Sequence, residues 1–119
     1  MYITNFGQYI RQLREEHAAQ SKEFSVRKVA AKIGVEPAFL SKVERGLVSP
    51  PSEAKIIALA GVLETDKDVL LAMAGKVSSD LLEIIRERPV LFAELLRKLK
   101  EEPDHAVLKV VREVKDGDW

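Results

Sequence analysis

The side chains best suited to chemistry in this sequence lie on one face of a predicted helix in the first half of the chain. Ala38, Ser41, Lys42 and Arg45 follow one another at intervals that bring them to the same side of a helix. Hydroxyl, ammonium and guanidinium groups on an exposed face can donate hydrogen bonds to phosphates and to acceptors on base edges. The spacing therefore indicates a surface that binds nucleic acid.

Enzymatic chemistry has much weaker support. Ser25 and Lys28 form an S-x-x-K pair, but the sequence lacks the companion triplets and the large scaffold of the enzymes that use this pair. His17 and His105 are isolated, and neither has other ligands at metal-binding spacing. The absence of cysteine excludes disulfides and thiolate chemistry. We therefore expect no catalytic residue, no metal site and no cofactor.

Two short helices must position the polar face. Residues 25–46 contain two sets of apolar side chains, and Gly34 separates them. Two short helices joined by a glycine-bearing turn form a helix-turn-helix, which leaves the outer face of the second helix free to enter a DNA major groove. The first apolar set is Val26, Val29, Ala30 and Ile33, and the second is Leu40, Val43 and Leu47.

Local signals mark the ends of these two helices. Ser25 can cap the first helix through its hydroxyl, and Gly34 can end that helix with a positive φ. Pro37 suits the first turn of the second helix, where its missing N–H costs nothing. Glu36 precedes it, and its negative charge is favourable at a helix N-terminus.

The rest of the first 75 residues is also predicted to be helical. Asn5 and Gln8 have the spacing of a capping box for a helix over residues 6–17. Ser52 and Asp66 can cap two further helices. The apolar side chains of these three helices are Phe6, Ile10 and Leu13, then Ile56, Leu59, Ala60 and Leu63, then Val69, Leu70 and Met73.

A tail of different character follows Gly75. Ser78 or Ser79, then Pro89, then Pro103 mark the starts of three amphipathic segments. Helices this apolar need a partner surface, which the same chain or a second copy can supply. The last segment is rich in β-branched residues, so a strand is the alternative there. The apolar residues are Leu81, Leu82, Ile84 and Ile85, then Phe92, Leu95, Leu96 and Leu99, then Val107, Val111 and Val114.

Charge and composition are compatible with nucleic-acid binding. The chain has 119 residues and a net charge of zero, but residues 1–50 hold eight Lys and Arg against five Asp and Glu. Positive charge is therefore concentrated around the predicted helix-turn-helix, as phosphate binding requires. No apolar run reaches transmembrane length and no secretory signal opens the sequence, so we expect a cytoplasmic protein without membrane contact.

Residues 6 to about 75 resemble the XRE family of helix-turn-helix regulators, which includes the lambda and 434 phage repressors and Cro. The resemblance implies an all-α, five-helix lambda-repressor-like domain over residues 1–75, with a helical extension over residues 76–119. It also implies a sequence-specific transcriptional repressor that binds double-stranded DNA at an inverted repeat as a homodimer. The segments that carry the resemblance are FGQYIRQLRE, VAAKIGV, FLSKVERG, PPSEAKIIALAGVL and DVLLAMAG.

We expect residues 79–114 to form the dimer interface. Two alternatives remain open for this tail. It can cap the core of a single chain, or it can bind a protein partner such as a toxin or a regulatory peptidase, as antitoxin-like regulators do.

The sequence departs from the family pattern at three places. His17–Glu23 resembles an insertion, which can touch the DNA backbone or form a mobile loop. Val26 and Pro37 occupy positions where many members have glutamine, and neither can make a glutamine's contacts to DNA. Base recognition then depends on Ala38, Ser41 and Lys42, with Glu36 as a further candidate.

The expected DNA-binding residues therefore lie at the start of the first motif helix and along the second. For Arg45, an ion pair with Glu44 or with a neighbouring helix is the alternative role. Arg11 and Arg14 are interpreted as charges on a helix surface and are left out of the site. The expected site comprises Ser25, Arg27, Lys28, Glu36, Ala38, Ser41, Lys42 and Arg45.

Overall fold

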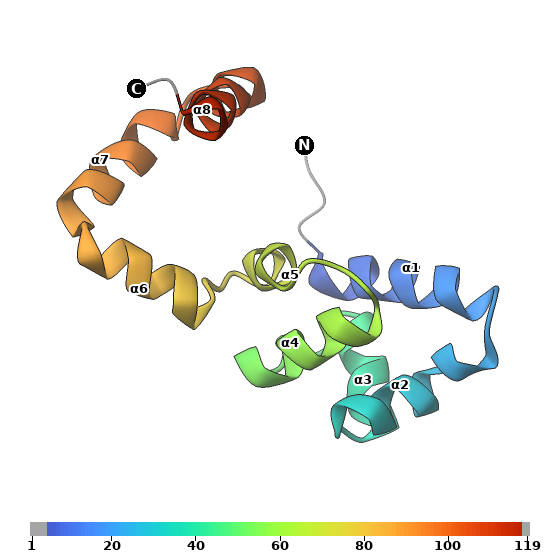
Figure 1. The fold of residues 1–119 in the computed structure, drawn as a ribbon. Coiled ribbons are helices and arrows are strands. Elements are labelled where there is room, and N and C mark those ends of the chain that lie inside the picture. The colour runs from blue at the N-terminus through green and yellow to red at the C-terminus, as the bar shows by residue number, and fades with distance from the viewer. Residues whose placement is uncertain (1–4, 118–119) are drawn as a thin grey trace. The chain divides into compact units, whose positions relative to one another are not determined.

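The computed structural model describes residues 5–117, and every regular element in this range is helical (Figure 1). The predicted all-α fold is therefore confirmed. The chain divides into two compact units, residues 1–79 and 80–119, which are described separately below. The helices are α1 (Phe6–Ala18), the 3₁₀ helix η1 (Lys22–Phe24), α2 (Val26–Ile33), α3 (Pro37–Glu44), α4 (Glu53–Val62), α5 (Lys67–Met73), α6 (Ser79–Glu87), α7 (Pro89–Leu99) and α8 (Asp104–Asp116).

One apolar core holds α1 to α5 together. It takes side chains from all five helices, and most of the residues expected to be buried are buried. Burial of this kind is the main favourable term in folding. The buried apolar residues are Phe6, Ile10, Val29, Ala30, Ile33, Leu40, Val43, Ile56, Leu59, Ala60, Leu63, Leu70 and Leu71.

Two apolar residues assigned to the inner faces are exposed instead. Leu47 is 62% exposed, because α3 ends at Glu44 and the helical periodicity no longer applies beyond it. Val69 is 49% exposed, because the short helix α5 turns Leu70 and Leu71 toward the core in its place. Leu47 and Val69 both lie within three residues of a helix end.

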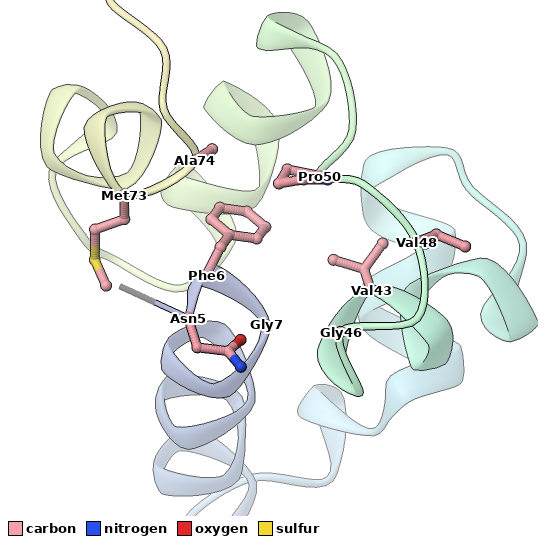
Figure 2. A pocket seen from close by; sticks show the side chains of 9 residues that line it. All are labelled: Asn5, Phe6, Gly7, Val43, Gly46, Val48, Pro50, Met73 and Ala74. Carbon is pink, nitrogen blue, oxygen red and sulfur yellow. The ribbon is translucent and has the colours of Figure 1, made fainter. Parts of the chain in front are cut away.

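Gly7 lets α1 approach the C-terminal end of α3 closely. A Cβ atom at this position would overlap the carbonyl oxygen of Val43 and lie 2.8 Å from that of Glu44. Figure 2 shows the neighbouring ring of Phe6 between Val43 and Met73. These three residues and Gly7 help to line a small pocket. A glycine inside a helix is usually unfavourable, and here it is required by the contact between two backbones.

The segment expected to be an insertion is ordered by its contacts. Helix α1 continues to Ala18, and residues 22–24 form η1, whose N-cap Ser21 accepts a hydrogen bond from Glu23 N at 3.1 Å. His17 Nε2 lies 2.8 Å from the carbonyl oxygen of Leu63, and its ring stacks on Phe24 with centroids 4.6 Å apart. Residues 22–24 of this segment are therefore a short helix with defined contacts to the rest of the first unit.

The second unit has helices but no core of its own within the described residues. Pro89 opens α7 as predicted, and residues 107–114 lie in α8, so the strand alternative is wrong. None of the residues of α6, α7 and α8 is buried.

Among residues 5–117 no helix is both long and apolar enough to cross a membrane.

Candidate nucleic-acid interface

Both ends of α2 are capped, and a side chain from α4 contacts the turn between α2 and α3. Ser25 Oγ accepts a hydrogen bond from Lys28 N at 3.2 Å, and Gly34 has a φ of 75°, as both residues were predicted to do. Lys55, from α4, adds a contact that the sequence does not signal. Its ammonium donates hydrogen bonds to the carbonyl oxygens of Ile33 at 3.0 Å and Gly34 at 3.3 Å. These bonds satisfy carbonyl groups that the end of a helix leaves without partners.

Helix α3 has one buried side and one exposed side. Leu40 and Val43 are each 2% exposed and face the core. Ala38 and Lys42 are exposed, and Ser41 is partly exposed. Pro37 is the first residue of the helix, as predicted. The expected polar face is therefore present and accessible on this helix.

A buried ion pair joins α1 to α3. Arg14 Nε donates to Glu44 Oε2 at 2.7 Å and Arg14 Nη2 donates to Glu44 Oε1 at 2.9 Å, while Nη1 donates to the carbonyl oxygen of Phe24 at 3.2 Å. Hydrogen bonding to Glu44 raises the pKa of Arg14 above its ordinary value, against the opposing effect of burial. The interpretation of Arg14 as a surface charge is wrong. This residue instead fixes the position of α3 on α1.

The same ion pair changes the role of Arg45. Because Glu44 is committed to Arg14, the expected alternative pair between Glu44 and Arg45 does not form. Arg45 is exposed, and its Nε donates to the carbonyl oxygen of Ser41 at 3.3 Å. This single hydrogen bond leaves most of the guanidinium's donors available to a ligand.

The start of α2 carries the other expected cations. Arg27 is exposed, and it forms no ion pair with any residue that the structure describes. Lys28 Nζ donates to Glu23 Oε2 at 2.8 Å. Lys32 lies one turn further along α2. Its Nζ is 3.9 Å from Glu23 Oε1 and 4.9 Å from the centroid of the Phe24 ring. Glu23 thus contacts two cations on one face of α2, and sequence reasoning missed this cluster.

Glu36, Phe39 and Val26 lie near the starts of α2 and α3 in different surroundings. Glu36 is exposed and is the N-cap of α3, but its side chain makes no capping hydrogen bond. Phe39 and Val26 are partly buried and pack against the core. Of these three, only Glu36 remains a candidate for contact with a ligand.

The arrangement is suited to recognition. The exposed groups around α2 and α3 include hydrogen-bond donors and cations that can bind phosphates and base edges. No group of three or more His, Cys, Asp or Glu side chains in the described part of the chain could hold a metal ion. Every buried side-chain nitrogen and oxygen there has a hydrogen-bond partner. The buried pair of Arg14 and Glu44 therefore serves the fold, and the exposed Arg27 and Lys42 are available for binding.

Comparison with known proteins shows the family to which this chain belongs. A family model described as helix-turn-helix domain matches residues 5–73. The chain therefore belongs to the helix-turn-helix domain family, and its resemblance to the XRE regulators is confirmed.

One curated relative and one solved structure are similar to this chain. An uncharacterized HTH-type transcriptional regulator, RghRB of Bacillus subtilis (strain 168), is 35% identical over 77 residues, which are 65% of this chain and 52% of that protein. The chain thus spans about half the length of the curated relative that it matches. A chain of a solved SinR protein/SinI protein complex is 28% identical, with a TM-score of 0.47, over 80% of this chain and 94% of that chain.

Proposed function

We propose that this protein is a sequence-specific, DNA-binding transcription regulator that inserts α3 into the major groove. One observation carries this proposal. Helix α3 buries Leu40, Val43 and Glu44 against the domain and leaves Ala38 and Lys42 facing outward. Side chains at the start and along the outer face of the second helix contact base edges in helix-turn-helix proteins. In this chain the residues in those positions are Glu36, Ala38, Ser41 and Lys42.

The N-terminal turn of α2 binds the DNA backbone in this proposal. Helix N-termini present free backbone N–H groups and a partial positive charge, both of which favour a phosphate. Arg27 and Lys28 add side-chain cations at this end, and the hydroxyl of Ser25 can donate to the same phosphate. Arg45, beyond the end of α3, supplies a further backbone contact. Such contacts set the register of the protein on DNA without reading its sequence.

In this proposal the C-terminal extension forms the interface of a homodimer. The dimer acts as a repressor that binds inverted repeats. Large apolar side chains lie exposed along α6, α7 and α8, and faces of this kind in a folded protein mark interaction sites. A two-fold dimer through residues 79–114 buries these faces and presents two copies of α3 to two half-sites. The large exposed apolar residues of these helices are Leu81, Leu82, Ile84, Val90, Leu91, Leu95, Leu96, Val107, Leu108, Val111 and Val114.

The same exposed faces favour a second candidate function. A regulator of the antitoxin-like or peptidase-controlled type uses its C-terminal helices to bind a different protein. This function and homodimerisation require different partners on the same residues, so the mass of the purified protein in solution separates them.

Selection from a random DNA pool is the decisive experiment. We expect the full-length protein to enrich an inverted repeat with half-sites about 10–10.5 base pairs apart, or a multiple of this spacing. Sedimentation of the free protein should give the mass of two chains. Enrichment of no sequence overturns specific recognition, and a monomer that binds single half-sites overturns the dimeric repressor.

A further inference from the structure

We propose that Glu23 is an internal competitor for DNA phosphate, which occupies Lys28 in the free protein and lowers the affinity of the domain for any duplex. The proposal rests on the function proposed above. It assigns a role to the segment between α1 and α2, which neither the family resemblance nor the polar face of α3 explains.

The first step is the geometry of the cluster. Lys28 and Lys32 are four residues apart in α2, so their side chains share one face of the helix. The carboxylate of Glu23 accepts a hydrogen bond from Lys28 Nζ at 2.8 Å and lies 3.9 Å from Lys32 Nζ. A carboxylate that accepts bonds from a lysine in this way occupies the place a phosphate oxygen would take.

The second step distinguishes the two lysines. Lys32 Nζ also donates to the backbone carbonyl of Glu23 at 3.2 Å and lies over the ring of Phe24, so it is held whether or not the carboxylate is charged. Lys28 Nζ has only the Glu23 carboxylate as a partner among the described side chains. Lys28 is therefore the cation that can exchange Glu23 for a phosphate.

The third step is that the competitor is held in place. Ser21 caps η1 by accepting a hydrogen bond from Glu23 N at 3.1 Å, and the ring of Phe24 stacks on His17. The carboxylate itself remains accessible, with 57% of its side chain exposed. A phosphate that approaches Lys28 therefore meets a fixed negative charge beside it. Arg27, one residue away, has no such neighbour and serves as the internal reference.

Binding of a random-sequence duplex by the full-length protein tests the proposal, because a backbone contact does not depend on sequence. We expect Glu23→Gln to raise the affinity by about two- to fivefold, the range in which exposed ion pairs act. We also expect the slope of log affinity against log salt to steepen by up to about 0.9, the contribution of one phosphate contact.

A double-mutant cycle tests whether Glu23 acts through Lys28. In a Lys28→Ala background, Glu23→Gln should change the affinity far less than in the native background, because the group it releases is missing. In an Arg27→Ala background the full increase should remain. Glu16→Gln removes one negative charge from an exposed side chain that accepts a hydrogen bond from Gln12 Nε2 at 3.2 Å, which a glutamine can also accept, and it controls for net charge.

A spectroscopic readout is independent of affinity. Hydrogen bonding from Lys28 lowers the pKa of Glu23 below its ordinary value of 4.5. Addition of the duplex should raise the pKa of this carboxyl group, measured by NMR, because Lys28 leaves it and a phosphate approaches.

The outcomes separate this inference from the function on which it rests. Failure of the native protein to bind any duplex overturns both. If the native protein binds DNA and Lys28→Ala weakens the binding, an increase for Glu23→Gln no larger than that for Glu16→Gln overturns the role of Glu23 alone. If Glu23→Gln raises the affinity equally in the Lys28→Ala background, the role of Glu23 is overturned as well.

Discussion

At the residue scale, the outer face of α3 contains one strong donor, Lys42. It is exposed, and it forms no ion pair among the residues that the structure describes. If Lys42 contacts a base edge, Lys42→Ala should weaken binding to the selected operator by about 1–3 kcal/mol and leave binding to a random duplex less affected. A fluorescence titration against both duplexes measures the difference. An equal loss on the two would make Lys42 a phosphate contact instead.

Gly7 provides a second prediction at this scale, about the fold. Because a Cβ atom here would overlap the backbone of α3, Gly7→Ala should destabilise the protein by about 1–3 kcal/mol. Gly61, inside α4, is the matched control because a Cβ there would meet nothing within 4 Å. Gly61→Ala should stabilise the protein by about 0.5–1 kcal/mol. Urea unfolding of both variants checks the pair, and equal effects would show that helix propensity alone governs these positions.

Residues whose roles are local were predictable from the sequence. Ser25, Gly34 and Pro37 act on the helix that they begin or end, so their types alone indicate what they do. Arg14 and Glu44 could not be recognised in this way, because they lie 30 residues apart and each resembles an ordinary surface charge. Burial decides their role, and burial depends on how the helices pack.

At the element scale, α3 depends on α1 for its position through the buried Arg14–Glu44 pair. Removing one partner of such a pair leaves an uncompensated charge inside the protein. Glu44→Gln should therefore lower the free energy of unfolding by about 3–5 kcal/mol. Thermal unfolding monitored by circular dichroism would measure the loss.

The exposed pair between Arg11 and Glu15 supplies the control for this element. Its atoms are 3.2 Å apart, but 54% and 56% of the two side chains are exposed. Glu15→Gln should therefore cost no more than about 0.5 kcal/mol. A loss for Glu44→Gln as small as this would mean that solvent reaches the buried pair.

The sequence predicted where helices begin more accurately than it predicted which helices contact one another. The capping residues and prolines predicted the starts of α1, α2, α3, α4, α5 and α7. The 3₁₀ helix η1 was not predicted, because three residues are too few to show a periodicity. The cluster of Glu23, Lys28 and Lys32 was missed for the same reason, since it requires η1 to bring Glu23 beside α2.

At the scale of the whole molecule, the extension is the part whose role the sequence leaves most open. Its amphipathic pattern predicted helices correctly, but an apolar face has no sequence signal for what covers it. The structure adds that none of the residues in α6, α7 and α8 is buried within the described chain. The homodimer through residues 79–114 therefore remains a proposal.

A single charge on α7 tests this interface in the intact chain. Leu96 is 58% exposed, so Leu96→Glu should leave the fold of the first unit intact and place a charge in the proposed interface. We expect sedimentation to give a monomer and the affinity for the inverted repeat to fall. Leu47, 62% exposed in the first unit, is the control, and Leu47→Glu should remain a dimer. A dimer in both variants would place the interface elsewhere.

The ammonium of Lys55 has a consequence for how the turn moves in time. Because this one group from α4 holds the carbonyl oxygens of Ile33 and Gly34, the turn cannot open as a free loop does. Opening of the turn breaks these two bonds, so the backbone amides at the end of α2 should exchange with solvent more slowly in the native protein than in a Lys55→Met variant. The orientation of the two motif helices then depends in part on a third helix, and in the proposed function this helix pre-organises the surface that meets DNA.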